Sequence, residues 1–229
     1  MCGVSLLFTV VYFFVDKYSE RRYYRKPVEP TPFGIETFKC VLYFDVRFWI
    51  VSVLCMTYYA GVMPFIGMLS GWLSNKYGYS ESDAGHLSSV VILASMVLSP
   101  FLGKAVDIVG RRPLIVALGS MLILPAHAVL SLTGPNFTYT VFPLWPIIAI
   151  GLSFSLVPAA LWPCVPMLVP EENTGTAFGA MTAVQNCGLF LVNLVVNYIR
   201  GNYGDEAAMI FFVVADGLGL LGAILLYLV

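Results

Sequence analysis

A cluster of charged residues lies between two long apolar segments, within residues 103–112. The cluster follows the pattern G-x-x-x-D-x-x-G-R-R. Charged groups at the mouth of a membrane span are costly unless they have a function. The carboxylate at Asp107 can accept hydrogen bonds from Arg111 or Arg112, and the flanking glycines allow a tight reversal of the chain. We therefore predict a functional loop here, although the two arginines could also be simple anchors at the membrane surface.

A second set of polar residues forms a stripe along the apolar segment 174–198. Its members are separated by three, four or seven residues, so in a helix with about 100° per residue they share one face. Such a stripe either bonds neighbouring helices or lines a water-filled pathway, and its length favours the pathway. The stripe consists of Thr182, Asn186, Asn193, Asn197 and Arg200, with Gln185 beside it.

Aromatic residues and prolines supply further candidates for a binding site. The segment 141–168 contains five prolines and Trp162. Prolines kink helices and free carbonyl groups that can face a cavity, and broken membrane helices are frequent substrate sites. Trp162 and Pro163 are therefore candidates. Tyr58 and Tyr59 form an aromatic pair in the segment 46–70, where they either contact a ligand or pack in the interior.

The titratable residues at membrane depth are few. Asp216 is the only acid deep in the last apolar segment, and an intramembrane carboxylate is a functional hypothesis by default. Gly217 and Gly219 favour close helix packing at this position instead. We expect His86 and His127 to be interfacial residues near helix ends, where an acidic compartment could protonate them.

The composition requires an exterior that faces lipid. Hydrophobic residues make up 59% of the chain and charged residues 11%, whereas a soluble domain carries roughly 25% charged residues. The net charge of −1 gives no indication of a nucleic-acid partner, and the five cysteines lack the spacing of a metal site or a disulfide framework. We expect a protein embedded in the lipid bilayer, without enzymatic activity, metal, cofactor or nucleic acid.

The elements that position these residues are membrane spans. Each predicted span can cross about 30 Å of hydrocarbon, and backbone groups in lipid must be paired, so we expect an all-α membrane protein. The opening run, residues 1–16, is apolar but short, and both ends of the sequence lie inside apolar runs, from which we expect a truncated chain. The six complete spans are predicted at residues 46–70, 84–103, 112–133, 141–168, 174–198 and 207–229.

The basic residues predict the orientation of the spans. Of 12 lysines and arginines, all but Lys76 and Arg200 lie before residue 48 or within residues 103–112. The positive-inside rule places this larger group in the cytosol. Asn136 begins an N-glycosylation sequon in a loop on the opposite, luminal or extracellular side, and it is the glycosylation candidate.

The charged pattern at residues 103–112 resembles the loop signature of the major facilitator superfamily. That superfamily carries the signature twice, once in each half of a transporter, and here it appears once. The resemblance implies part of helix six at residues 1–16, a cytosolic central linker at 17–45, and the C-terminal six-helix bundle at 46–229. It also implies a conformational latch, closed by ion pairs in the outward-open state and released in the inward-open state, formed by Gly103, Asp107, Gly110, Arg111 and Arg112.

Other motifs are similar to those of the lysosomal dipeptide transporters of this superfamily. The motifs are Tyr58-Tyr59 with Pro64-Phe65-Ile66-Gly67, Leu161-Trp162-Pro163 with Val169-Pro170-Glu171, and Gly175-Thr176-Ala177-Phe178-Gly179 with Gln185-Asn186 and Gly188. The resemblance implies export of dipeptides, notably cationic ones, from the lysosome by a uniporter that works by alternating access. It also implies two partners, the missing N-terminal half and a glycosylated single-span accessory protein. The candidates for the substrate pathway are Tyr58, Tyr59, Trp162, Gln185, Asn186, Asn193 and Asn197.

Two departures leave the substrate and the partner open. Gly110-Arg111-Arg112 is closer to the general superfamily pattern than to that of the dipeptide transporters, and Asp216 is unusual for them. One alternative is another organic-solute facilitator, which if coupled to protons would need a carboxylate in its cavity. A second alternative is a membrane fragment that does not transport, because six helices lack the second wall of the pathway. The lysosomal membrane location rests on the resemblance alone.

Overall fold

The computed structural model describes residues 2–23, 39–133 and 143–228, and within them the chain is helical without strands. It consists of two units, Met1–Thr37 and Phe38–Val229. The described part contains six helices that are long enough and apolar enough to cross a membrane. The prediction of an all-α membrane protein with six complete spans is therefore confirmed. Asn136 and most of the predicted linker lie outside the described residues.

Among its described residues, 2–23, the first unit contains one helix, α1 (Cys2–Tyr23). It runs past residue 16, where we expected the apolar helix to end. The added residues include lysine, glutamate and arginine, which have high helix propensity, so the helix continues where the hydrophobic run stops.

The second unit contains the six long helices. Three of them extend beyond the predicted spans 46–70, 84–103 and 174–198 by several residues, because capping residues rather than the limits of hydropathy end them. Asp45 caps the first of the six through its carboxylate, and Gly78, Gly110 and Gly204 end three of them with positive φ angles. The helices are α3 (Val46–Tyr77), α4 (Glu81–Val109), α5 (Arg112–Leu132), α6 (Leu144–Leu161), α8 (Thr174–Tyr203) and α9 (Asp205–Leu228).

The predicted span 141–168 is broken before it ends. After α6 come a short 3-10 helix, η2 (Trp162–Cys164), and a single helical turn, α7 (Val165–Leu168). Two further 3-10 helices are η1 (Cys40–Tyr43) and η3 (Glu171–Asn173). The break falls where we expected prolines to interrupt the helix, and it places Trp162 at an irregular point of the backbone.

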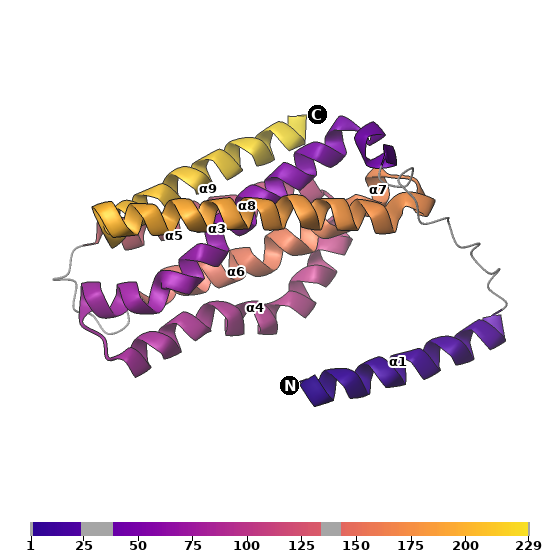
Figure 1. The fold of residues 1–229 in the computed structure, drawn as a ribbon, viewed down its shortest axis with the longest axis horizontal. Helices are drawn as coiled ribbons and strands as arrows, with labels where there is room; N and C mark the ends of the chain where they lie inside the picture. The colour runs from indigo at the N-terminus through magenta and orange to yellow at the C-terminus, as the bar shows by residue number, and fades with distance from the viewer. Residues whose placement is uncertain (1, 24–38, 134–142, 229) are drawn as a thin grey trace. The chain divides into compact units, whose positions relative to one another are not determined.

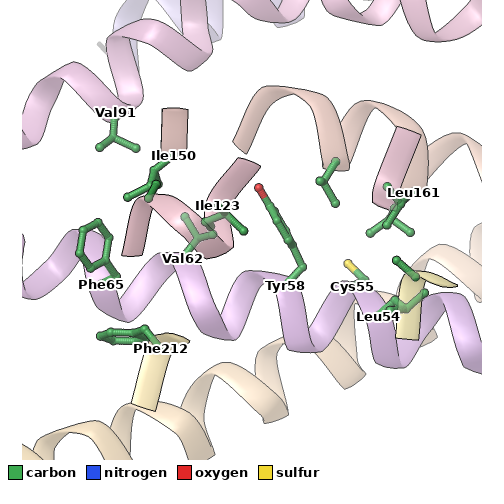
Figure 2. Close-up of a cluster of buried hydrophobic side chains, with 14 of the residues drawn as sticks. Leu54, Cys55, Tyr58, Val62, Phe65, Val91, Ile123, Ile150, Leu161 and Phe212 are labelled. Atoms are coloured by element: carbon green, nitrogen blue, oxygen red, sulfur yellow. The ribbon is translucent and has the colours of Figure 1, made fainter. Parts of the chain in front are cut away.

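Helix α3 runs through the middle of the second unit (Figure 1). In the most apolar stretch of 18 residues, 56% of the residues of α3 are buried, whereas only 17% are buried in the corresponding stretches of α4 and α8. Side chains of α3, among them Tyr58, Val62 and Phe65, pack with Ile123 of α5 and Ile150 of α6 in one hydrophobic core (Figure 2). The core therefore forms around α3, while α4 and α8 keep faces that this unit does not cover.

Helices α4 and α6 approach each other closely at Gly151. A Cβ atom on Gly151 would lie 2.7 Å from the carbonyl oxygen of Val91 and 3.0 Å from the Cβ atom of Ala94. Small residues permit this kind of backbone approach between membrane helices. The position therefore has no room for a larger side chain unless the two helices separate.

We expect Gly151→Ala to lower the free energy of unfolding by about 1–3 kcal/mol, the usual cost of overpacking a tight core. Thermal unfolding in detergent, followed by tryptophan fluorescence, measures the change. The matched control is Gly179→Ala on α8, where a Cβ atom would meet no atom within 4 Å. Equal losses from the two variants would contradict the close contact between α4 and α6.

Candidate functional site

The predicted loop at 103–112 is mostly helical. Helix α4 continues through Val109, so only Gly110 and Arg111 turn the chain before α5 begins. The expectation of a ten-residue loop is therefore wrong. Gly110 ends α4 at φ 68°, with its N–H bonded to the carbonyl of Val106 at 2.9 Å. A glycine is required there because other residues are strained at that φ.

Arg112 connects this turn to the break after α6. Its Nη1 atom donates to the carbonyl oxygen of Pro163 at 2.6 Å and lies 3.0 Å from the sulfur of Met167. Its Nη2 atom lies 3.6 Å from Oδ1 of Asp107. The Arg112 side chain is 14% exposed and that of Asp107 is 71% exposed, so the bond to the backbone is the better shielded of the two contacts. Arg112 thus joins α4, α5 and η2.

The other two predicted latch residues have no comparable contacts. Arg111 is exposed, and no ion pair of its side chain is found in the described residues. A Cβ atom on Gly103 would meet nothing within 4 Å, so no close packing requires glycine at this position. The structure therefore brings together Asp107, Gly110 and Arg112.

Four aromatic residues gather next to this break. The indole N–H of Trp162 donates to the hydroxyl of Tyr59 at 3.2 Å. The Trp162 ring stacks on Phe178 with 6.0 Å between centroids, and Tyr59 meets Phe154 edge to face at 6.0 Å. We call Tyr59, Phe154, Trp162 and Phe178 the aromatic cluster. It joins α3, α6, η2 and α8.

Gln185 lies close to α3 on the same side as the aromatic cluster. Its Oε1 atom is 3.9 Å from the sulfur of Cys55, one helical turn before Tyr59. A thiol is a weak donor, so this contact leaves most of the hydrogen-bonding capacity of the amide unused. Three of the predicted pathway residues, Tyr59, Trp162 and Gln185, therefore come from three different elements to one region.

Tyr58 points in a different direction from Tyr59. Its side chain enters the hydrophobic core (Figure 2), where its hydroxyl shares a 2.9 Å hydrogen bond with Ser153. Ser153 in turn donates to the carbonyl of Gly119 at 2.8 Å. This polar contact holds α3, α5 and α6 together. The Tyr58 ring still meets that of Tyr59 edge to face with 6.1 Å between centroids, but its hydroxyl bonds in the core and not in the aromatic cluster.

The polar stripe of α8 lies on an open face. Thr182, Asn186, Asn193 and Asn197 are all exposed. Asn193 donates to Leu189 within its own helix at 2.8 Å, and no asparagine of the stripe bonds another helix among the described residues. The stripe is therefore free to contact water, a substrate or a second bundle. Its last member, Arg200, pairs instead with Asp205 at 2.7 Å.

Sequence reasoning missed a buried pair between α5 and α9. His127 is fully buried, and its Nδ1 atom lies 2.5 Å from Oδ2 of Asp216. The expectation that His127 is interfacial is therefore wrong. We expected Gly217 to allow close helix packing beside Asp216, but a Cβ atom there would meet nothing within 4 Å. The glycine that packs closely against Asp216 is Gly61 of α3, where a Cβ atom would lie 3.1 Å from Oδ1. The described residues contain no group of three His, Cys, Asp or Glu side chains that could hold a metal ion.

Lys76 forms a second contact that was not predicted, at the other end of the bundle. Its ammonium group donates to the carbonyls of Leu130 and Ser131 and pairs with Glu206 at 2.9 Å. It also lies 4.9 Å from the centre of the Trp72 ring. Only 7% of its side chain is exposed, so Lys76 ties the ends of α3, α5 and α9 together.

Comparison with known proteins gives consistent matches. The family model described as Major Facilitator Superfamily matches residues 1–193. A Homo sapiens protein named lysosomal dipeptide transporter MFSD1 is 32% identical over 230 residues, which cover 100% of this chain and 47% of that protein. The Danio rerio protein of the same name is 33% identical, over 99% of this chain and 48% of its own length.

A more distant match is the quinolone resistance protein NorA of Staphylococcus aureus (strain N315). It is 29% identical over 133 residues, which cover 58% of this chain and 33% of that protein. The chain spans about half the length of the curated relatives that it matches over all its residues.

Proposed function

This chain belongs to the major facilitator superfamily and is a multi-pass membrane protein, and we propose that it forms one wall of an alternating-access pathway for small organic solutes. The main observation behind the proposal is that two adjacent residues of η2 contact two different parts of the bundle. Pro163 accepts the hydrogen bond from Arg112, and the adjacent Trp162 contacts Tyr59 and Phe178. A movement of the α4–α5 turn would therefore be transmitted to the aromatic cluster through one short piece of backbone.

The proposed substrates are dipeptides, with a preference for cationic ones, exported from the lysosome to the cytosol by uniport. The names of the relatives support a dipeptide substrate and a lysosomal location. Aromatic rings attract cationic side chains, and the exposed amides of α8 can bond peptide groups. In this proposal the basic end of the bundle is cytosolic, the protein lies in the lysosomal membrane, and a glycosylated single-span protein accompanies it.

Transport in this proposal requires a second six-helix bundle. One bundle supplies only one wall of a pathway, whereas transporters bind substrate between two repeats. The uncovered faces of α4 and α8, including the polar stripe, are the surfaces available for that second wall. We propose that an N-terminal half of the same kind occupies them.

The alternative function is a facilitator of other organic solutes, coupled to protons. The match to NorA, named for quinolone resistance, supports an organic solute other than a dipeptide. A coupled carrier needs a titrating group in its pathway, and Asp216 instead faces His127 inside the bundle. Asp216 therefore does not supply that group from this bundle.

The transport proposal is tested in proteoliposomes that contain the chain together with a second six-helix bundle. Uptake of lysine- or arginine-containing dipeptides should saturate with concentration and should not depend on a proton gradient. Uncharged dipeptides and a quinolone serve as comparison substrates. Indifference to all dipeptides would defeat the substrate proposal, and uptake that follows the proton gradient would favour the alternative.

Within the same assay we expect Trp162→Ala to raise KM for a lysine-containing dipeptide about tenfold, which corresponds to loss of a cation–π contact worth about 1.4 kcal/mol. Tyr59→Phe should raise KM by a smaller factor, because the ring remains and only the bond to the indole is lost. The matched control is Tyr58→Phe, which removes a core hydroxyl and should leave KM unchanged. A larger effect at Tyr58 than at Tyr59 would refute the aromatic cluster as a substrate site.

A further inference from the structure

We propose that a pocket at the basic end of the second unit binds the headgroup of an anionic phospholipid. The pocket has a volume of about 270 Å³. It lies between the first turns of α3 and α5, the short helix α7 and the last turns of α9. It is separate from the aromatic cluster and from the polar stripe of α8, so the proposed substrate pathway does not account for it.

Two guanidinium groups make the pocket attractive to an anion. Arg47 on α3 and Arg112 on α5 both line it, whereas no acidic residue does. Arg47 is exposed, and its side chain forms no ion pair within the described part of the chain. Arg112 uses Nη1 for Pro163, but its Nη2 atom is 3.6 Å from Asp107, too far for a hydrogen bond. Each arginine therefore keeps donors that a phosphate oxygen can use.

The helix ends at the pocket contribute fields of both signs, because α3 and α5 begin there while α4 and α9 end there. Arg47 and Arg112 lie in the first turns of α3 and α5, where unpaired N–H groups and the helix dipole favour negative charge. The carboxylate of Asp45 already caps α3 through the N–H of Arg47 at 2.7 Å. The attraction for an anion therefore comes from the two arginines and not from the helix dipoles.

The remaining wall of the pocket is apolar and indicates a lipid rather than a free ion. Val51, Met167 and Leu226 contribute to it, and the Met167 side chain is 70% exposed. Inorganic phosphate would leave these side chains in contact with water. A phospholipid can place its phosphate between the arginines and its glycerol and upper acyl chain against the apolar wall.

The position of the pocket in the membrane agrees with this occupant. The pocket is formed at the ends of the apolar spans, which is the level of lipid headgroups. Lys104 and Arg111 are exposed at the same end of the bundle without lining the pocket. They raise the concentration of anionic lipid near the surface, whereas Arg47 and Arg112 would hold one molecule in place.

The test measures retention of phosphatidylglycerol by the purified 229-residue chain, using native mass spectrometry and thermal unfolding at increasing lipid. Phosphatidylcholine is the neutral comparison. We expect one tightly held phosphatidylglycerol, and a loss of affinity of about fivefold in Arg47→Gln, which follows from the usual contribution of one basic residue near an anionic surface. The matched control is Lys104→Gln, which removes one positive charge from the same end outside the pocket and should change affinity less than twofold.

Two further measurements distinguish a lipid seated in the pocket from general attraction to the basic surface and from binding of a free anion. Leu226→Trp keeps both arginines but fills the pocket, and it should weaken phosphatidylglycerol binding at least as much as Arg47→Gln. Inorganic phosphate at millimolar concentration should not displace the lipid or raise the unfolding temperature. The proposal is overturned if Lys104→Gln weakens binding as much as Arg47→Gln, if Leu226→Trp binds normally, or if phosphate alone protects the chain.

Discussion

Replacing His127 with leucine is expected to lower the free energy of unfolding by about 3–5 kcal/mol, because it leaves the Asp216 carboxylate buried without its partner. The two side chains lie between α5 and α9 with 0% and 5% exposure. The rings of Phe65 and Phe212 flank the imidazole with centroid distances of 4.4 Å and 5.8 Å, so His127 lies in a largely apolar environment. The second imidazole nitrogen has no hydrogen-bond partner among the described residues, so Asp216 is the contact that compensates the burial of His127.

The size of the loss distinguishes two accounts of this pair. An ordinary hydrogen bond between membrane helices is worth about 0.6 kcal/mol on average. Asp216→Asn keeps a hydrogen-bonding side chain of the same size and should lose only about that amount. A loss of about 0.6 kcal/mol in His127→Leu as well would indicate that no charge is stranded, and would contradict the expectation.

The effect of Asp216→Ala on stability should have opposite signs in the native chain and in the His127→Leu variant. Asp216→Ala should destabilise the native chain, but should stabilise the His127→Leu variant because it removes the unpaired carboxylate. Unfolding in detergent, followed by tryptophan fluorescence, measures all four proteins. His86→Leu is the control, because His86 is exposed on α4 and should tolerate the change. Simple additivity of the two single losses would show that the side chains do not interact.

Replacing Arg112 with alanine is expected to slow transport at saturating substrate by at least about tenfold. A hydrogen bond from a charged donor is worth about 1.5–3 kcal/mol, and about 1.4 kcal/mol corresponds to a factor of ten in an equilibrium. The bond from Arg112 to Pro163 links the α4–α5 turn to the break beside Trp162. If this bond forms in only one conformation, its loss shifts the balance between the two conformations by its full free energy.

The neighbouring arginine provides the control for this prediction. Arg111→Ala removes the same charge from the same turn, but Arg111 is exposed and lacks an ion pair in the described residues. It should reduce the transport rate less than twofold. Arg112→Lys should be intermediate, since a lysine keeps the charge but cannot reproduce the forked contacts to Pro163 and Asp107. Equal losses at residues 111 and 112 would show that charge alone, and not the contact to η2, controls transport.

The spans could be predicted because hydropathy and length suffice to identify helices that cross a bilayer. Their ends could not, because polar residues such as Lys76 and Asp107 continue a helix beyond the hydrocarbon. The prolines of 141–168 correctly predicted a broken helix, because loss of backbone donors is a local effect. Which carbonyl at the break would bind Arg112 depends on how α5 packs against α6, and no local pattern contains that information.

The candidate site likewise contains residues whose position could be predicted from the sequence and residues whose position could not. Helical periodicity placed Asn186, Asn193 and Asn197 on one face of a helix, and that face is open. The adjacent tyrosines had the same local signal, yet Tyr59 joins Trp162 while Tyr58 bonds Ser153 in the core. Consecutive residues on a helix point about 100° apart, so only the arrangement of the neighbouring helices decides what each one meets.

The sequence by itself determined that this chain is a helical membrane protein of the major facilitator superfamily, because composition, span length and the charged motif are properties of local segments. Only the tertiary structure decided the partners of the polar side chains. His127 and Asp216 are 89 positions apart, and each alone resembles an isolated polar residue in an apolar segment. Their contact exists because α5 and α9 pack side by side, and an unpaired polar group in that core would be too costly to keep.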